Sequence, residues 1–156
     1  MALTDFVKRY YMKTALKISE SSKDPNTKVG AIIVRNNKII GSGINEMPKK
    51  LNSEFPWERN GDFVNTKYAY VEHAEINAIL DAMDKGCTDL SNSEIYVTLF
   101  LCNECAKVIV QLGIKNIYYY SDKYHDEPST IASRKIFEVC GATTENISSL
   151  GDVKIG

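Results

Sequence analysis

Four residues in two short segments carry the clearest chemical signal of the chain. His73 and Glu75 are separated by one alanine, and Cys102 and Cys105 form a Cys-x-x-Cys pair. One imidazole and two thiolates make a three-ligand zinc set, which leaves a fourth position of the ion open for water. Zinc bound in this way activates water near neutral pH. The sequence therefore predicts a Zn²⁺ cofactor with His73, Cys102 and Cys105 as its ligands.

Glu75 supplies the proton-transferring group that hydrolysis at such a site needs. It follows His73 by two residues, so on one helical turn it can reach the water and the substrate without being a ligand. We expect it to take a proton from the water, to protonate a ring nitrogen and then to protonate the leaving ammonia. His-x-Glu followed by Pro-Cys-x-x-Cys is the signature of zinc-dependent nucleobase deaminases. Leu101 stands where this signature has proline, but leucine can adopt the same backbone φ, so we expect the thiolate geometry to be kept.

Two other interpretations of the cysteine pair stay open at this point. A closed structural zinc site needs a fourth protein ligand, for which Cys87, His125 and Cys140 are the candidates. A thioredoxin-like redox pair fits a strand–Cys-x-x-Cys–helix context, but it leaves the His73 and Glu75 pattern unexplained.

Composition limits the class of protein. The chain has 156 residues, 44% hydrophobic and 25% charged, which predicts a single domain over residues 1–156. Its net charge is −1 and it has no long basic run, which argues against a polymeric nucleic acid as partner. Residues 1–10 lack the apolar core of a signal peptide, and no stretch approaches the ~20 apolar residues of a membrane span. We therefore expect a cytoplasmic protein that uses its cysteines as thiols.

The elements that must position the site can be read from hydrophobic periodicity and from turn residues. We expect helices over residues 3–20, 73–85, 102–112 and 128–140, and strands over 29–34, 38–43, 94–99, 114–120 and 142–147. Asn36 and Asn37 predict a tight hairpin turn. Residues 45–70 read as mostly irregular, and an irregular segment of this length is usually functional or mobile. From residue 94 onward strand and helix alternate, which predicts parallel strands with helices packed against them.

In several segments the chain resembles deoxycytidylate (dCMP) deaminases of the zinc cytidine-deaminase superfamily. The resemblance is carried by residues 24–30, 66–79, 99–107 and 121–126, which include DPNTKVG, YVEHAEINAI, LCNECAK and SDKYHD. It implies a three-layer α/β/α sandwich around a mixed five-stranded sheet. It also implies hydrolysis of dCMP to dUMP and ammonia for thymidylate synthesis, and a homo-oligomer.

The resemblance and the loop positions together indicate substrate contacts. Asn45 matches the asparagine with which the family contacts the sugar, and Asn26 is a second polar candidate, although it could equally cap its own loop. Lys123, Tyr124 and His125 follow a predicted strand end, where a phosphate could bind; a solvated loop is the competing interpretation. Ala74 is also expected among the substrate contacts.

A departure from the family pattern concerns regulation. Family members often read Gly-Tyr-Asn-Gly-x-Pro where residues 43–48 read Gly-Ile-Asn-Glu-Met-Pro, and in regulated members this segment helps bind dCTP as activator and dTTP as inhibitor. Glu46 adds a side chain and a negative charge, so we expect a weak or altered effector response. Lys28, Glu46, Trp57 and Arg59 are the candidates for an effector site, and Trp57 and Arg59 could also shape the pocket or a subunit interface.

Three alternative functions remain. A relative acting on dCTP, or on both dCMP and dCTP, would differ in only a few phosphate contacts. A tRNA adenosine deaminase shares His-Ala-Glu but would need a more basic surface. A catalytically silent zinc-binding interaction module is the alternative of another class, and Glu75 argues against it.

Overall fold

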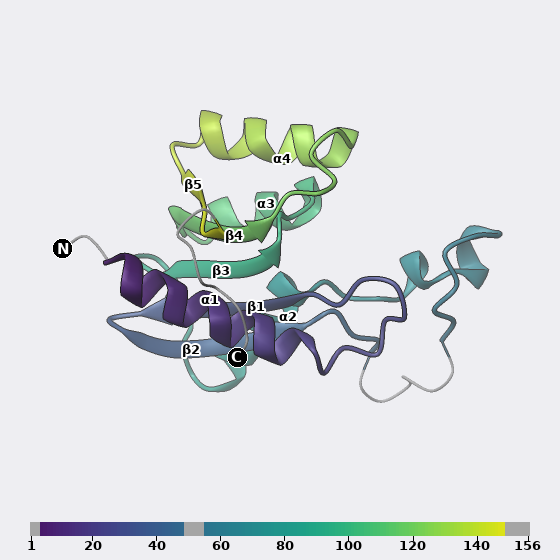
Figure 1. Cartoon of the computed structure of the whole chain (residues 1–156), viewed down its shortest axis with the longest axis horizontal. Coiled ribbons are helices and arrows are strands. Elements are labelled where there is room, and N and C mark those ends of the chain that lie inside the picture. Colours follow the sequence, from purple (N-terminus) through teal and green to yellow (C-terminus); the bar gives the residue numbers. More distant parts are fainter. Residues whose placement is uncertain (1–3, 49–54, 149–156) are drawn as a thin grey trace.

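The computed structural model of the protein describes residues 4–48 and 55–148. One five-stranded sheet, in the order β2-β1-β3-β4-β5, has helices on both of its faces (Figure 1). The helices are α1 (Asp5–Ser19), α2 (Ala74–Asp84), α3 (Asn103–Gln111) and α4 (Pro128–Val139). The strands are β1 (Gly30–Arg35), β2 (Lys38–Ile44), β3 (Glu94–Leu99), β4 (Asn116–Ser121) and β5 (Thr143–Asn146).

The sheet is mixed, as expected. β1 pairs antiparallel with both β2 and β3, whereas β3–β4 and β4–β5 are parallel. Asn36 and Asn37 join β1 to β2 with φ values of 51° and 60°. Two consecutive left-handed residues define the type I′ turn that suits a twisted hairpin, and asparagine tolerates this conformation well. The predicted hairpin is therefore confirmed.

Side chains that alternate along β1 separate two hydrophobic cores. Ala31 and Ile33 pack toward α2, α3 and α4, while Ile32 and Val34 pack toward α1. α1 covers its face of the sheet with Met12 and other apolar residues. The three-layer α/β/α sandwich predicted from the resemblance is confirmed.

Two glycines of β2 let α2 lie directly on the sheet. A Cβ at Gly43 would lie 2.6 Å from the Ala74 carbonyl oxygen and 2.7 Å from the Asn77 carbonyl carbon. Gly41 makes a similar approach, 2.8 Å from the Ala82 Cβ. Because ordinary carbon contacts are about 3.5–4.0 Å, no larger residue fits there without moving the helix. The start of α2 is therefore set by β2.

The expected elements differ from the observed ones mainly at their ends. The segment expected to be irregular contains two 3₁₀-helices, η2 (Phe63–Asn65) and η3 (Lys67–Ala69). Each has only three residues, too few for hydrophobic periodicity to reveal. Residue 3, the first of the predicted N-terminal helix, and residues 49–54 of this segment lie outside the described residues. Within the described ranges, no helix combines the length and the apolar character needed to cross a membrane.

Candidate active site and metal centre

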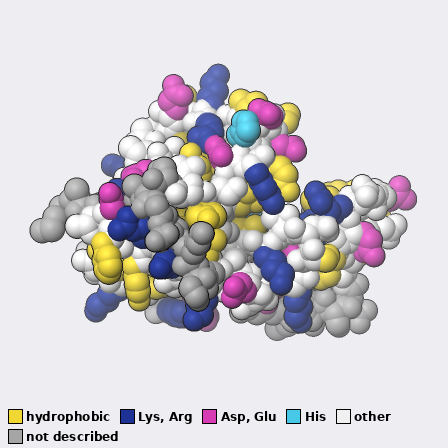
Figure 2. All heavy atoms as spheres, viewed as in Figure 1, with side chains coloured by type: hydrophobic (Ala, Val, Ile, Leu, Met, Phe, Trp, Pro, Cys, Tyr) yellow, Lys and Arg dark blue, Asp and Glu magenta, His cyan; other side chains and the backbone are white. Residues whose placement is uncertain are grey.

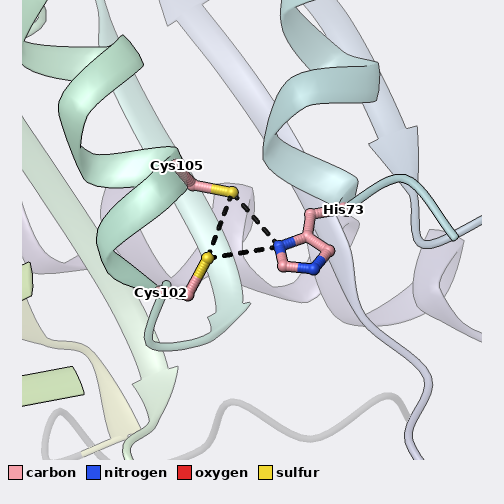
Figure 3. Close-up of side chains that lie close together, drawn as sticks. All are labelled: His73, Cys102 and Cys105. Carbon is pink, nitrogen blue, oxygen red and sulfur yellow. Dashed lines mark hydrogen bonds between the residues drawn. The ribbon is translucent and has the colours of Figure 1, made fainter. Parts of the chain in front are cut away.

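Two helix N-termini bring the predicted zinc ligands together. His73 is the N-cap residue of α2, and Cys102 is the N-cap residue of α3, both with extended backbone. The His73 carbonyl accepts the Asn77 N–H at 3.0 Å, and the Cys102 carbonyl accepts the Ala106 N–H at 3.0 Å. Each helix therefore begins directly after its first ligand. Figure 3 shows the two sulfurs on one side of a common point and the His73 imidazole on the other.

The distances between the three donor atoms match one tetrahedral zinc ion. The His73 Nδ1 lies 3.3 Å from Cys105 Sγ and 3.4 Å from Cys102 Sγ, and the two sulfurs are 3.7 Å apart. Zn–S bonds of about 2.3 Å and Zn–N bonds of about 2.0–2.1 Å would place the donors about 3.5 Å and about 3.8 Å apart. The donor set fits Zn²⁺ in both chemistry and spacing.

Among the residues that the structure describes, the donor group contains three residues and not four. In the described parts of the chain, the ligand-type atoms that lie within 4.8 Å of one another belong to His73, Cys102 and Cys105. The candidates for a fourth ligand, Cys87 and Cys140 among them, are not in this group. A three-residue set is typical of catalytic zinc, whereas structural sites are closed by four ligands.

Protons and a metal ion compete for these donors. The hydrogen bond between the sulfurs lowers the pKa of Cys102 to about 4, and the same bond, with burial, raises the pKa of Cys105. A hydrogen bond with Cys102 raises the pKa of His73 to about 9. Because zinc binds thiolates and a neutral imidazole, protons compete with the metal for these donors, and metal affinity falls as the pH is lowered.

Glu75 lies in the first turn of α2, beside the donors but outside their group. It is 3% exposed, and burial is the main reason that the pKa of its carboxyl group is raised. A carboxyl group with a raised pKa exchanges protons more readily near neutral pH than an exposed glutamate does. Its position suits the predicted proton transfer.

A pocket of about 310 Å³ opens above these residues, and His73, Glu75 and Cys102 line its floor. Its walls come from loops on both sides of the sheet edge where β3 and β4 end, which is where α/β proteins usually bind ligands. The other lining residues are Asp24, Thr27, Val29, Asn45, Arg59, Lys67, Tyr68, Val71, Ala74, Leu99, Phe100, Leu101, Tyr124, Glu127, Ser129 and Thr130.

Phe100 forms a rigid apolar part of the wall. Its ring meets Tyr119 edge-on at a centroid distance of 4.9 Å and Phe137 at 6.1 Å. The guanidinium of Arg134 lies 4.2 Å over the same ring and is held by Asp122 at 2.9 Å. Contacts of this kind fix the ring, because edge-on aromatic pairs and cation–π pairs are both directional.

Asn45 lies at the opposite wall with its amide already engaged. Its Nδ2 donates to the Thr27 carbonyl at 2.8 Å and to Asp24 Oδ2 at 3.3 Å, and its Oδ1 accepts the Val29 N–H at 2.9 Å. The oxygen keeps one free lone pair. Asn45 can therefore accept a further hydrogen bond in the pocket but has no donor left for it.

The structure brings some of the predicted contacts together and leaves others apart. Asn45, Ala74, Tyr124 and Arg59 line the pocket together with His73 and Cys102. The lining does not include Asn26, Lys28, Trp57, Lys123 or His125. Glu46 lies in a separate groove beside α2. The four effector-site candidates are thus not gathered in one place.

Several lining residues were not expected from the residue pattern. Asp24 reads as part of a turn, and Lys67 and Tyr68 read as part of a long loop, yet all three line the pocket. Ser129 and Thr130 belong to the first turn of α4, whose start was predicted from Pro128. The sequence could have indicated that these residues line a binding site, because the N-terminus of this helix follows the end of β4 and its free N–H donors favour anions.

The fold and the three-donor site define a zinc-dependent hydrolytic centre of the nucleobase-deaminase type. The pattern of the cytidine and deoxycytidylate deaminase zinc-binding region matches residues 7–121, and the chain belongs to this family. The predicted resemblance and the predicted Zn²⁺ cofactor are both confirmed at this level.

Individual relatives make the likeness more specific. The chain is 47% identical over 137 residues to human deoxycytidylate deaminase, covering 86% of this chain and 75% of that protein. It is 42% identical to a probable deoxycytidylate deaminase of Drosophila melanogaster, covering 85% and 68%. The structure of a cyanophage S-TIM5 dCMP deaminase in complex with dCMP and dUMP is similar with a TM-score of 0.74 and 30% identity, covering 93% of this chain and 99% of that one.

Proposed function

We propose that the protein is an enzyme that hydrolyses dCMP to dUMP and ammonia with zinc as cofactor. One observation carries the proposal: a three-residue zinc donor set lies beside a buried carboxyl group at a pocket of about 310 Å³, and His73, Cys102 and Glu75 line this pocket. The 47% identity to human deoxycytidylate deaminase and the likeness to a phage enzyme that binds dCMP and dUMP select the substrate within the family. A product of this kind would supply thymidylate synthesis.

The chemistry divides between the metal and Glu75. Zinc, when bound, lowers the pKa of a water molecule and so supplies the nucleophile for attack at C4 of the cytosine ring. Glu75 accepts the first proton that this water loses and delivers it to ring nitrogen N3. It then takes the remaining proton of the hydroxyl group added at C4 and gives it to the amino group, which leaves as ammonia as the C4–N bond breaks and the C4 carbonyl of dUMP forms. Burial of Glu75 raises the pKa of its carboxyl group and so favours its acting as both acceptor and donor.

Asn45 and Ala74 would hold the nucleoside above this floor. Because the Asn45 amide has a free acceptor and no free donor, it suits a sugar hydroxyl that donates. Ala74 presents only a methyl group next to His73, which leaves room for the flat ring. Asn26 donates its backbone N–H to Asp24 at 2.8 Å, and a direct substrate contact of its side chain stays a prediction.

The phosphate would lie at the mouth of the pocket. Arg59 is exposed there, and the first turn of α4 contributes Ser129 and Thr130 to the same lining. Arginine and helix N-termini both favour phosphate, through charge-assisted hydrogen bonds and free N–H groups. Tyr124 also lines the mouth, and a hydrogen bond with Thr27 lowers its pKa, which makes its hydroxyl a better donor. Lys123 and His125 flank this residue and stay predicted contributors.

We also propose that dCTP and dTTP act weakly or not at all on this protein. The segment that departs from the family pattern lines a groove with Glu46, Glu72, Asp81 and Asp84. Among the described residues that line this groove, none is a lysine or an arginine. Four carboxylates repel a triphosphate, which needs cations or N–H donors. Lys28 and Trp57, the other effector candidates, are not part of this lining.

The partners, the cellular location and the assembly of the protein are part of the same proposal. Lys and Arg side chains are interspersed with Asp and Glu on the face seen in Figure 2, which does not favour a polymeric nucleic acid as partner. All four cysteines are free thiols, which is in keeping with a cytoplasmic protein. A single domain over residues 1–156 and a homo-oligomer complete the proposal.

An ammonia-release assay tests the function. The zinc-loaded protein is given dCMP, dCTP, CMP or deoxycytidine, each with and without dCTP or dTTP as effector. We expect turnover of dCMP that is insensitive to effectors. Turnover of dCTP would move the function to the triphosphate branch of the family. Silence toward all four, with zinc bound, would support the binding-module alternative instead.

A further inference from the structure

A buried ion pair in the pocket wall has no part in the chemistry described above. Lys67 Nζ lies 2.5 Å from Asp24 Oδ2, and the side chains of Lys67 and Asp24 are 10% and 0% exposed. Both residues line the pocket. Removing two charges from water is costly, and such a pair often adds little to stability compared with apolar residues of the same size. Stability alone therefore does not account for this ion pair.

Asp24 joins three separate segments through its two oxygens. Oδ1 accepts the backbone N–H groups of Asn26 and Thr27 at 2.8 and 3.1 Å. Oδ2 accepts Asn45 Nδ2 at 3.3 Å as well as Lys67 Nζ. These four bonds fill the carboxylate, and every donor except Lys67 comes from the body of the domain.

Lys67 connects the Asp24 carboxylate to the segment that carries Arg59. Its backbone N–H donates to the Glu58 carbonyl at 2.9 Å, next to Arg59. The residue after it, Tyr68, lines the pocket with Arg59 and raises the pKa of the Arg59 guanidinium. In Figure 1 the described part of residues 55–70 extends away from the sheet. Lys67 thus links the stretch that carries Arg59 to the buried Asp24.

We propose that Lys67 is a positioning residue for phosphate binding, which holds Arg59 and Tyr68 at the mouth of the pocket through its ion pair with Asp24. The inference rests on the proposed function, because the phosphate gives Arg59 its role. Lys67 itself need not touch the substrate. Its charge is matched by Asp24, so the phosphate is left to Arg59, Tyr124 and the start of α4.

The main test compares Lys67→Met with a matched lysine variant. Lys85→Met removes an exposed lysine that pairs with Asp81 at 2.9 Å on α2 and is not among the pocket-lining residues. We expect Lys67→Met to raise KM for dCMP about tenfold or more, with kcat changed less than about threefold and zinc content unchanged. Lys85→Met should leave both constants as they are. A lower Tm for Lys67→Met with an unchanged KM would overturn the proposal.

Two further measurements keep the proposal testable on its own. Asp24→Asn keeps the shape of the side chain but removes its charge, so it should raise KM like Lys67→Met, and the double variant should be no worse than either. If the effects of the two substitutions on KM multiply in the double variant, Lys67 and Asp24 do not act as one unit.

Hydrogen exchange of the amides over residues 57–70 needs no turnover. Faster exchange in Lys67→Met than in Lys85→Met supports the role of the ion pair as an anchor, and equal exchange overturns it. Absence of dCMP turnover in the unmodified protein would instead refute the proposed function.

Discussion

Replacing Gly43 by alanine tests whether the packing of α2 on β2 sets the zinc site. The added Cβ would lie 2.6 Å from the Ala74 carbonyl oxygen. Reaching an ordinary contact of about 3.5 Å requires the start of α2 to move by roughly 0.9 Å. His73 immediately precedes this helix, so its Nδ1 would move away from the two sulfurs. A misplacement of about 1 Å at a reacting centre can cost about 10²-fold in rate.

The assay measures zinc affinity by competition with a chelator, together with kcat for dCMP and Tm. Overpacking costs about 1–3 kcal/mol of stability, so Tm should fall in any case. Gly30→Ala is the matched control, because its Cβ would lie 3.0 Å from the Ser19 backbone nitrogen of α1, on the face away from the site. We expect both variants to lose stability and only Gly43→Ala to lose zinc affinity and rate. Equal zinc affinity and equal kcat in the two variants would show that the packing of α2 on β2 does not set the zinc site.

Three other predictions follow from single residues. Arg59→Ala should raise KM for dCMP about tenfold while its rate with deoxycytidine stays unchanged, and an equal loss on both substrates would contradict a phosphate contact. Asp24 has its pKa lowered in the folded protein despite burial, mainly by the hydrogen bond with Lys67. Its stabilising contribution is present above its ordinary pKa and lost as the pH falls through the lowered value, so Asp24→Asn should flatten acid unfolding below about pH 4. Saturating dCTP should change dCMP turnover by less than about fivefold, the lower end of usual allosteric coupling, and strong saturable activation would contradict the role given to Glu46.

The zinc ligands could be predicted from the sequence because their positions depend on local structure. His73, Cys102 and Cys105 sit at the starts of two helices, and helix starts are set by nearby residues. The hairpin at Asn36 and Asn37 was predictable for the same reason, since asparagine is one of the few residues that favour its backbone conformation.

The walls of the pocket could not be predicted in the same way. Lys67 and Arg59 lie in a segment that contacts the body of the domain through the ion pair of Lys67 with Asp24, 43 residues before Lys67 in the chain. No periodicity marks such a contact, and Asp24 followed by proline reads as an ordinary turn. The order of the strands, with β1 between β2 and β3, is likewise a property of tertiary packing that alternation of elements does not determine.

We expect Glu75 to move protons at a zinc site that binds metal without it. The most direct measurement is the dCMP turnover and the zinc content of Glu75→Gln, which keeps the shape of the buried side chain and removes its proton chemistry. We expect about one equivalent of zinc, as in the unmodified protein, with turnover reduced by at least about 10²-fold. Turnover at the unmodified rate, with zinc bound, would contradict this account.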